Sequence, residues 1–203
     1  MKKYLFIIIS VLFVPLHSNG QLKETFDSNS WQWTEIAMSY GKAYIIDGVM
    51  RLESKKDSKT PISQVVSEVS THAYLPFDPV HGFHIKCNAL VDKIDDNKLF
   101  GFVLDYLDDY NCILFMIEDD TAYLFKIKDG NIVGYNHNSF KIQGSKKKAQ
   151  LDIEVIYNTD ELEIRVNDVR AIYCRYVPIK SNGFGFFAYG KCKVDFDNVE
   201  IID

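Results

Sequence analysis

The chain has 203 residues, of which 47% are hydrophobic and 14% aromatic, so it has the apolar surface for a packed core and is not mainly disordered. Its 23 basic and 28 acidic side chains give a net charge of −5, so we expect no nucleic-acid partner and no anionic membrane surface. The 14 Phe and 12 Tyr, against 11 Gly and 5 Pro, favour strands.

Residues 1–20 have the features of a secretory signal peptide. A basic start and an apolar run over 4–16 precede a small side chain at Gly20, which predicts cleavage before Gln21. The alternative is an uncleaved N-terminal anchor, for which the run is short. We therefore predict one mature domain over 21–203 with no stable transmembrane segment, located outside the cytoplasm as a secreted, periplasmic or cell-surface protein.

Alternation of apolar and polar residues at a period of two runs through the rest of the chain and predicts antiparallel strands. The dipeptides Asp47-Gly48 and Asp129-Gly130 each separate two such segments, which is the strongest local sign of a β-hairpin. The flanking strands are expected over 42–46 and 49–53 in the first hairpin, and over 123–128 and 131–135 in the second.

Two further segments, 99–106 and 111–117, are apolar at almost every position. Burial on both faces is expected of such segments, so they are predicted to lie centrally in a sheet. Longer loops are expected over 55–63, 70–81 and 136–148.

The four cysteines are Cys87, Cys112, Cys174 and Cys192, and no two of them form a C-x-x-C pair, so zinc-knuckle and thioredoxin-like sites are not supported. Cys87 and Cys192 alternate in step with apolar neighbours and are predicted to face the core. Small buried thiols and one or two disulfides both fit this pattern.

A series of short motifs, taken in chain order, resembles the concanavalin A-like lectin and glucanase sandwiches, nearest to the laminin-G-like and family-16-like domains of secreted bacterial proteins. The motifs are Thr25-Phe26-Asp27 with Trp31 and Trp33 after it, Gly101–Asp105, Leu162–Asp168, Gly183–Ala188 and Val194–Ile201.

The resemblance implies an all-β fold, an antiparallel jelly-roll β-sandwich of two stacked sheets, with ligands on the concave face or its rim loops. It also implies that the last strand, 194–202, lies beside the first, 22–26. Trp31 and Trp33 would share one face of a strand and serve packing.

Family-16 glycosidases carry their two acids on one central strand in an E-x-D-x-E or E-x-D-x-x-E pattern, and no such pattern occurs in this sequence. The nearest match, Asp195-x-Asp197-x-x-Glu200, lies where Val194 and Phe196 are predicted to face the core, so its acids would point away. We therefore assign no catalytic residue and favour a protein that is not an enzyme.

No cofactor is expected and no residue is assigned as a metal ligand. The pair His81-x-x-His84 runs from a turn into a strand and is interpreted as two surface histidines. Structural calcium is the one ion for which the turns offer oxygen ligands. These ligands would come from Asp105, Asp108 and Asp109, or from Asp119 and Asp120.

Two loop clusters have the side chains that bind sugars, because aromatic faces stack on C–H surfaces and amide or carboxylate groups bind hydroxyls. They are Asp109, Tyr110 and Asn111, and Tyr135, Asn136 and His137 followed by Asn138. A tyrosine at a strand end also serves simply to pack the rim of a sandwich.

The function favoured by the sequence is that of a secreted, non-catalytic glycan-binding protein, with a polysaccharide or glycan as partner. One alternative is a glycoside hydrolase whose acids lie among Asp105, Asp109 and Glu118. The other is an adhesive or structural module that binds protein.

Overall fold

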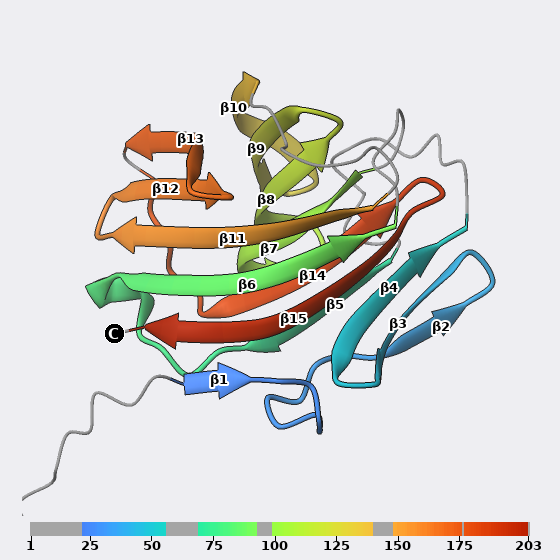
Figure 1. Cartoon of the computed structure of the whole chain (residues 1–203). Helices are drawn as coiled ribbons and strands as arrows, with labels where there is room; N and C mark the ends of the chain where they lie inside the picture. Colours follow the sequence, from blue (N-terminus) through green and yellow to red (C-terminus); the bar gives the residue numbers. More distant parts are fainter. Residues whose placement is uncertain (1–21, 56–68, 93–98, 140–147, 176, 203) are drawn as a thin grey trace, which may run out of the picture.

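The structure is a computed structural model, and it describes residues 22–55, 69–92, 99–139, 148–175 and 177–202, apart from the side chain of Tyr135. The predicted signal peptide lies outside these residues. The described chain forms two antiparallel sheets stacked face to face (Figure 1). None of its described helices has the length and apolar character needed to cross a membrane.

The larger sheet has nine strands. In spatial order they are β13 (Val169–Arg175), β12 (Glu161–Val166), β11 (Ala149–Asn158), β6 (Phe83–Val91), β15 (Lys193–Ile202), β4 (Val49–Ser54), β3 (Gly41–Ile46) and β2 (Ile36–Met38), with β1 (Leu22–Glu24) paired to β15 off this path. Leu22 lies opposite Ile201, so the first strand runs beside the last as the resemblance implies.

The smaller sheet has six strands. In spatial order they are β10 (Asn131–Ser139), β9 (Thr121–Lys128), β8 (Asn111–Glu118), β7 (Leu99–Asp108), β14 (Gly183–Tyr189) and β5 (Ser70–Tyr74). A short 3-10 helix, η2 (Pro79–His81), leads from β5 into β6. One lateral end of the sandwich thus has β5 at its edge, and at the other end β10 contacts β13 of the facing sheet.

Both predicted hairpins are confirmed. Asp47 and Gly48 have φ angles of 52° and 74°, and Asp129 and Gly130 have 51° and 72°. Positive φ at both central residues matches the twist of the adjoining strands, and glycine takes the second position at no steric cost.

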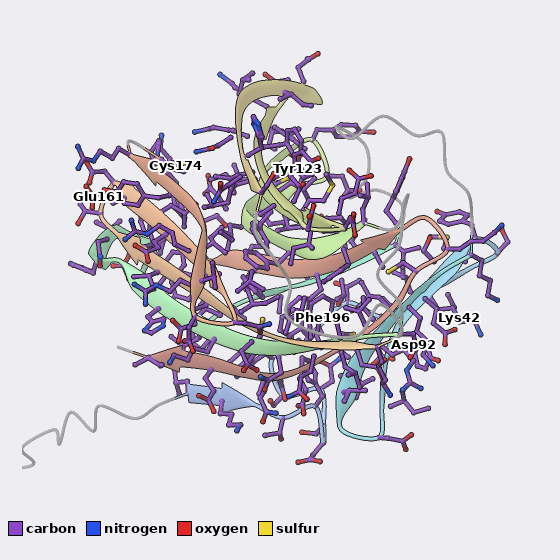
Figure 2. The ribbon with its side chains drawn as sticks, turned by 45° about the horizontal axis from the view of Figure 1, so that its top comes forward. Lys42, Asp92, Tyr123, Glu161, Cys174 and Phe196 are labelled. Carbon is purple, nitrogen blue, oxygen red and sulfur yellow. The ribbon has the colours of Figure 1, made fainter. Side chains whose placement is uncertain are left out.

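The core lies between the sheets and is strongly aromatic. Phe186 of the smaller sheet stacks on Phe196 of the larger sheet with ring centroids 4.0 Å apart, and Trp33 stacks on the same Phe186 at 5.2 Å. Phe196 is labelled in the interior of the molecule in Figure 2. The Phe186–Phe196 pair thus joins the two sheets through the core.

The prediction of strands buried on both faces is confirmed for β7 and β8. Phe102 faces the core, whereas Val103 and Leu114, which pair across the two strands, belong to a second apolar cluster on the outer face of the smaller sheet. This outer cluster extends over β9 and β14 through Phe125 and Phe187. Apolar side chains, and not carboxylates, therefore cover the middle of that face.

The expectation of a loop over 70–81 is wrong at its start, because Ser70–Tyr74 form β5, and the loop expected over 136–148 begins later, because β10 continues to Ser139. The core-facing residues of β5 are Thr71 and Ala73, which are too small to give a clear apolar alternation. The remainder of the expected loops over 55–63 and 136–148 lies mostly outside the described residues.

Trp31 and Trp33 do not share a strand. The segment around them is irregular, and Gln32 between them has a φ of 58°, which rotates the two side chains apart. Trp33 is 2% exposed and packs in the core, as expected, whereas Trp31 is only partly buried.

Cys87 and Cys192 are buried, which confirms their predicted orientation. Cys87, Cys112 and Cys174 are thiols and take part in no disulfide. Burial raises the pKa of the Cys87 thiol to about 12, with the charge of Asp152 adding to the effect, so the protein packs this thiol as a small apolar group.

Candidate functional site

A hollow of about 380 Å³ lies at the lateral end of the sandwich where β5 forms the edge of the smaller sheet. One wall comes from the irregular segment between β1 and β2, and the other from β5 and the residues after it. The lining residues are Ser30, Trp31, Gln32, Thr34, His72, Ala73, Tyr74 and Pro76. Two aromatic rings and an imidazole thus stand beside hydroxyl and amide groups.

The loop that carries Trp31 is organised by a buried carboxylate. Glu24, at the end of β1, is 2% exposed. Its Oε1 accepts a hydrogen bond from the Phe26 N–H at 3.0 Å, and its Oε2 accepts from the Ser30 hydroxyl at 2.7 Å and the Trp31 N–H at 3.1 Å. These three bonds compensate the burial of the charge and fix the loop at both ends.

Asn29 fixes the next part of the loop. Its side-chain amide donates to the carbonyl of Trp33 at 2.9 Å, and its carbonyl oxygen accepts from the Trp33 N–H at 2.6 Å. With the indole of Trp33 packed in the core, this clamp gives Trp31 and Ser30 a rigid support.

The other wall is attached to the first by backbone pairing. The Thr34 N–H donates to the carbonyl of His72 at 3.0 Å, and the Thr71 hydroxyl donates to the carbonyl of Thr34 at 2.6 Å. Thr34 Oγ1 also lies 3.3 Å from Nε2 of His72. The segment around Thr34 therefore covers the free edge of β5.

His72 and Tyr74 stand on the outer face of the smaller sheet, since Thr71 and Ala73 are buried on the other side. Gly185 of the neighbouring strand β14 lies opposite His72. With no side chain at Gly185, the imidazole reaches across β14 and stacks on Tyr106 of β7, with ring centroids 4.3 Å apart. Tyr74 remains 58% exposed beside the hollow.

The stacked rings connect the hollow to the turn between β7 and β8. The Tyr106 hydroxyl donates to Asp109 at 2.9 Å. Burial, the hydrogen bond to Asp109 and its charge raise the pKa of Tyr106, so the phenol stays protonated. Burial lowers the pKa of His72, and the charge of Asp109 acts in the opposite direction, so the imidazole is neutral at pH 7.

The first cluster predicted from the sequence lies in that turn. Asp109 faces Tyr106, while Tyr110 is 55% exposed and its ring lies against Gly130 of the adjacent turn. Asn111 bridges the same two turns, because it donates to Asp108 at 3.0 Å and accepts from the Asp129 N–H at 3.1 Å. The structure thus brings these three residues together, with the Asn111 amide already engaged in a structural role.

The second predicted cluster is divided between the two faces of β10. His137 pairs with Tyr123 and stacks on its ring at 6.5 Å, on the outer face. Asn136 points the other way and donates to the carbonyl of Tyr173 at 3.3 Å and to Sγ of Cys174 at 2.8 Å. Asn136 therefore joins the two sheets, and Tyr135 lies in β10 with its side chain outside the description.

Among the acids considered for hydrolysis, Glu118 lies far from Asp105 along β7. Glu118 pairs with Leu99 at one end of β7, and Asp105 follows six residues along the strand, a separation of about 20 Å at 3.3 Å per residue. Paired catalytic carboxylates stand about 5–10 Å apart. Asp105 is also engaged by the N–H groups of Lys180 and Ser181, at 2.8 and 2.7 Å.

The acids of the terminal strand face away from the core, as predicted. Asp195 forms a two-pronged ion pair with Arg51, with distances of 2.7 and 2.8 Å. Glu200 lies 3.0 Å from Lys23. Both acids therefore belong to the ion pairs that cover the outer face of the larger sheet. Among the described residues, no three His, Cys, Asp or Glu side chains come together as a set of metal ligands.

Comparison with solved structures supports the fold. The Bacillus licheniformis β-glucanase superposes with a TM-score of 0.62 over 92% of this chain and 99% of that one, at 10% identity. The chain has a concanavalin A-like jelly-roll fold. A Bacillus subtilis protein of unknown function with a galectin-like fold gives a TM-score of 0.60 at 11% identity, over 89% and 94% of the two chains.

The same concanavalin A-like sandwich forms part of a larger neighbour. GH43B of the Bacteroides ovatus xyloglucan locus matches with a TM-score of 0.60 at 14% identity. The match covers 88% of this chain but only 38% of the larger one. No family model matches the sequence, and no curated protein matches it either.

Sequence reasoning missed Trp31, His72 and Tyr74 as members of one site. The sequence pattern assigns Trp31 to packing with Trp33 and places His72 and Tyr74 in an expected loop. The available signal was the pattern Thr71-His72-Ala73-Tyr74, in which small residues alternate with ring-bearing ones. That pattern is typical of an edge strand with one face on the core and one aromatic face outward.

Proposed function

We propose that the protein binds glycan chains without cleaving them, and that the hollow between Trp31 and Tyr74 is the binding site. The observation that carries the proposal is its lining: aromatic rings that can stack on the C–H face of a sugar, with Ser30, Gln32 and Thr34 as partners for hydroxyls. The rigid loop supports this role, because a preorganised site spends little binding energy on ordering.

The wide separation of Glu118 from Asp105 supports the non-catalytic part of the proposal. Export from the cytoplasm, predicted from residues 1–20, would bring such a protein to extracellular polysaccharide. A structural calcium ion stays a prediction, which the measurement of melting temperature with and without calcium tests alongside the glycans.

The test is a panel of soluble polysaccharides, screened by affinity electrophoresis and followed by calorimetric titration. Trp31→Ala and Tyr74→Ala should each weaken the tightest glycan at least tenfold. The matched control is Tyr173→Ala, at an exposed tyrosine on β13 at the other lateral end, and it should leave affinity within twofold.

Two results would contradict the proposal. If the panel contains no ligand, or if both aromatic variants bind like the wild type, the hollow is not a glycan site. New reducing ends after long incubation with the bound polysaccharide would show that the protein is a hydrolase.

A further inference from the structure

We propose that the hollow selects uncharged glycans and discriminates against glycans that carry carboxylate or sulfate groups; this inference rests on the proposed function. It concerns the class of ligand, which follows from the charges placed around the site.

The described lining of the hollow holds no ammonium, guanidinium or carboxylate group. His72 is its only side chain able to become a cation by gaining a proton, and the burial of that ring beside Tyr106 favours the neutral form. An anionic sugar would therefore find hydroxyl, amide and aromatic partners, but no charge to pair with its own.

The three segments that build the site and its approach are 24–41, 69–85 and 105–113. None of them contains a Lys or Arg, in a chain that has 23. Their acids are Glu24, Asp27, Glu35, Asp78, Asp105, Asp108 and Asp109. The bases next to these segments along the chain include Lys23, which pairs with Glu200 at 3.0 Å, Lys42, and Lys86, which pairs with Glu154 at 2.6 Å. Lys180 lies in the segment that binds Asp105. Within these three segments the formal charge is therefore negative.

Asp109 is the acid with a direct connection to the hollow. Its carboxylate accepts from Tyr106, whose ring stacks on His72, so only one side chain separates the charge from the lining. The charge of Asp109 acts on the imidazole through this short path. Because only the Tyr106 side chain lies between Asp109 and His72, salt screens the Asp109 charge only in part, so an anion in the hollow is repelled.

Basic side chains gather at the opposite lateral end. Arg170 and Arg175 lie over the Tyr173 ring on the edge strand β13, at 5.2 and 5.9 Å from its centroid, and they pair with Glu163 and Glu161 of β12. Figure 2 shows Glu161 of β12 and Cys174 of β13 on the side of the molecule away from Lys42. The chain therefore keeps this group of cations away from the hollow.

The experiment compares neutral polysaccharides with charged derivatives of the same backbone, such as hydroxyethyl cellulose with carboxymethyl cellulose, and pullulan with carboxymethyl pullulan. For the backbone that binds best, the neutral form should bind at least tenfold more tightly at pH 7.5 and low salt. The ratio of the affinity for the neutral form to that for the charged form should decrease as salt is added, because screening weakens the repulsion.

Asp109→Asn removes the charge and keeps an acceptor for the Tyr106 hydroxyl, so it should reduce the neutral-to-anionic ratio at least threefold. Asp120→Asn makes the same change in net charge in the exposed turn between β8 and β9, and should leave the ratio unaltered. An unchanged ratio in Asp109→Asn, or equal binding of both forms by the wild type, overturns the selectivity. Failure of every glycan to bind would instead overturn the proposed function.

Discussion

Glu24 illustrates what a single buried side chain does for the site. A carboxylate that is almost fully excluded from water is costly, and here three donors from residues 26–31 offset that cost. The same bonds fix the backbone at Trp31 and thereby orient its side chain. The residue that shapes the hollow is therefore not among those that line it.

We predict that Glu24→Gln lowers the free energy of unfolding by about 1–3 kcal/mol, because an amide cannot accept from the Phe26 N–H and the Trp31 N–H at once. Urea denaturation measures the change. Glu35→Gln, at an exposed position of the same loop, should stay within about 0.5 kcal/mol of the wild type. Equal losses in the two variants would show that the Glu24 bonds contribute nothing specific.

His72 makes stability depend on pH. Burial lowers its pKa in the folded chain, with the charge of Asp109 opposing, whereas the unfolded chain takes up a proton near the ordinary value of about 6.5. The unfolded state then binds more protons, so the free energy of unfolding falls as the pH drops through 6.5. His84, whose pKa is also lowered by burial, acts in the same direction.

Between pH 7.5 and pH 5, the free energy of unfolding of His72→Gln should fall less than that of the wild type. Urea denaturation at each pH measures this difference. His84→Gln should show a similar reduction, since each variant removes one group that the unfolded chain protonates first. A decline identical to that of the wild type in His72→Gln would contradict this account.

At the scale of elements, β14 determines how the outer face of the smaller sheet is organised. A Cβ at Gly185 would overlap the carbonyl oxygen of Thr71 and lie 3.2 Å from Cβ of His72. Because Gly185 has no side chain, the rings of His72 on β5 and Tyr106 on β7 can meet across β14.

Gly185→Ala should therefore cost about 1–3 kcal/mol of unfolding free energy and displace His72 from Tyr106. Chemical denaturation gives the first quantity, and the ring-proton shifts of His72 report the second. Gly134→Ala on the edge strand β10, where the new Cβ would meet only the Lys126 side chain, should lose less than about 1 kcal/mol. A loss in Gly185→Ala no larger than that of the control would rule out the overlap.

Elements with strong local signals were predictable from the sequence. Asp47-Gly48 and Asp129-Gly130 specify their turns by chemistry within four residues, and the apolar segments of β7 and β8 exceed what one buried face requires. β5 was not predictable in this way, because its partners Phe184 and Gly185 lie more than 100 residues away and its core-facing side chains are small.

The hollow was less predictable than the fold for a related reason. Positive φ values at Phe26 and Gln32 break the alternation that assigns side chains to faces, so the environment of Trp31 follows from the loop and not from the pattern. The approach of His72 to Tyr106 depends on pairing between three strands distant in sequence. The turn clusters are local in sequence and were found, although Asn111 and Asn136 bind the protein itself.

At the scale of the whole molecule, the two lateral ends of the sandwich are closed differently. At one end the side chains of Asn136 and Asn138 of β10 donate to carbonyl groups of β13. At the other end a loop, and not a strand, covers the edge of β5. At the first end, β10 and β13 are joined directly by these hydrogen bonds, whereas the second end, at β5, contains the hollow.

The loop at the second end has a further consequence. An uncovered strand edge offers its peptide groups to any other extended chain, which is a route to aggregation. The segment that presents Trp31 also engages the His72 carbonyl through Thr34, so it shields β5 from such pairing. Exchanging this loop to alter ligand preference would expose the edge, and the variants would lose solubility before they lost their fold. Substitutions in this loop are therefore limited by the need to prevent aggregation through β5, as well as by the affinity for a ligand.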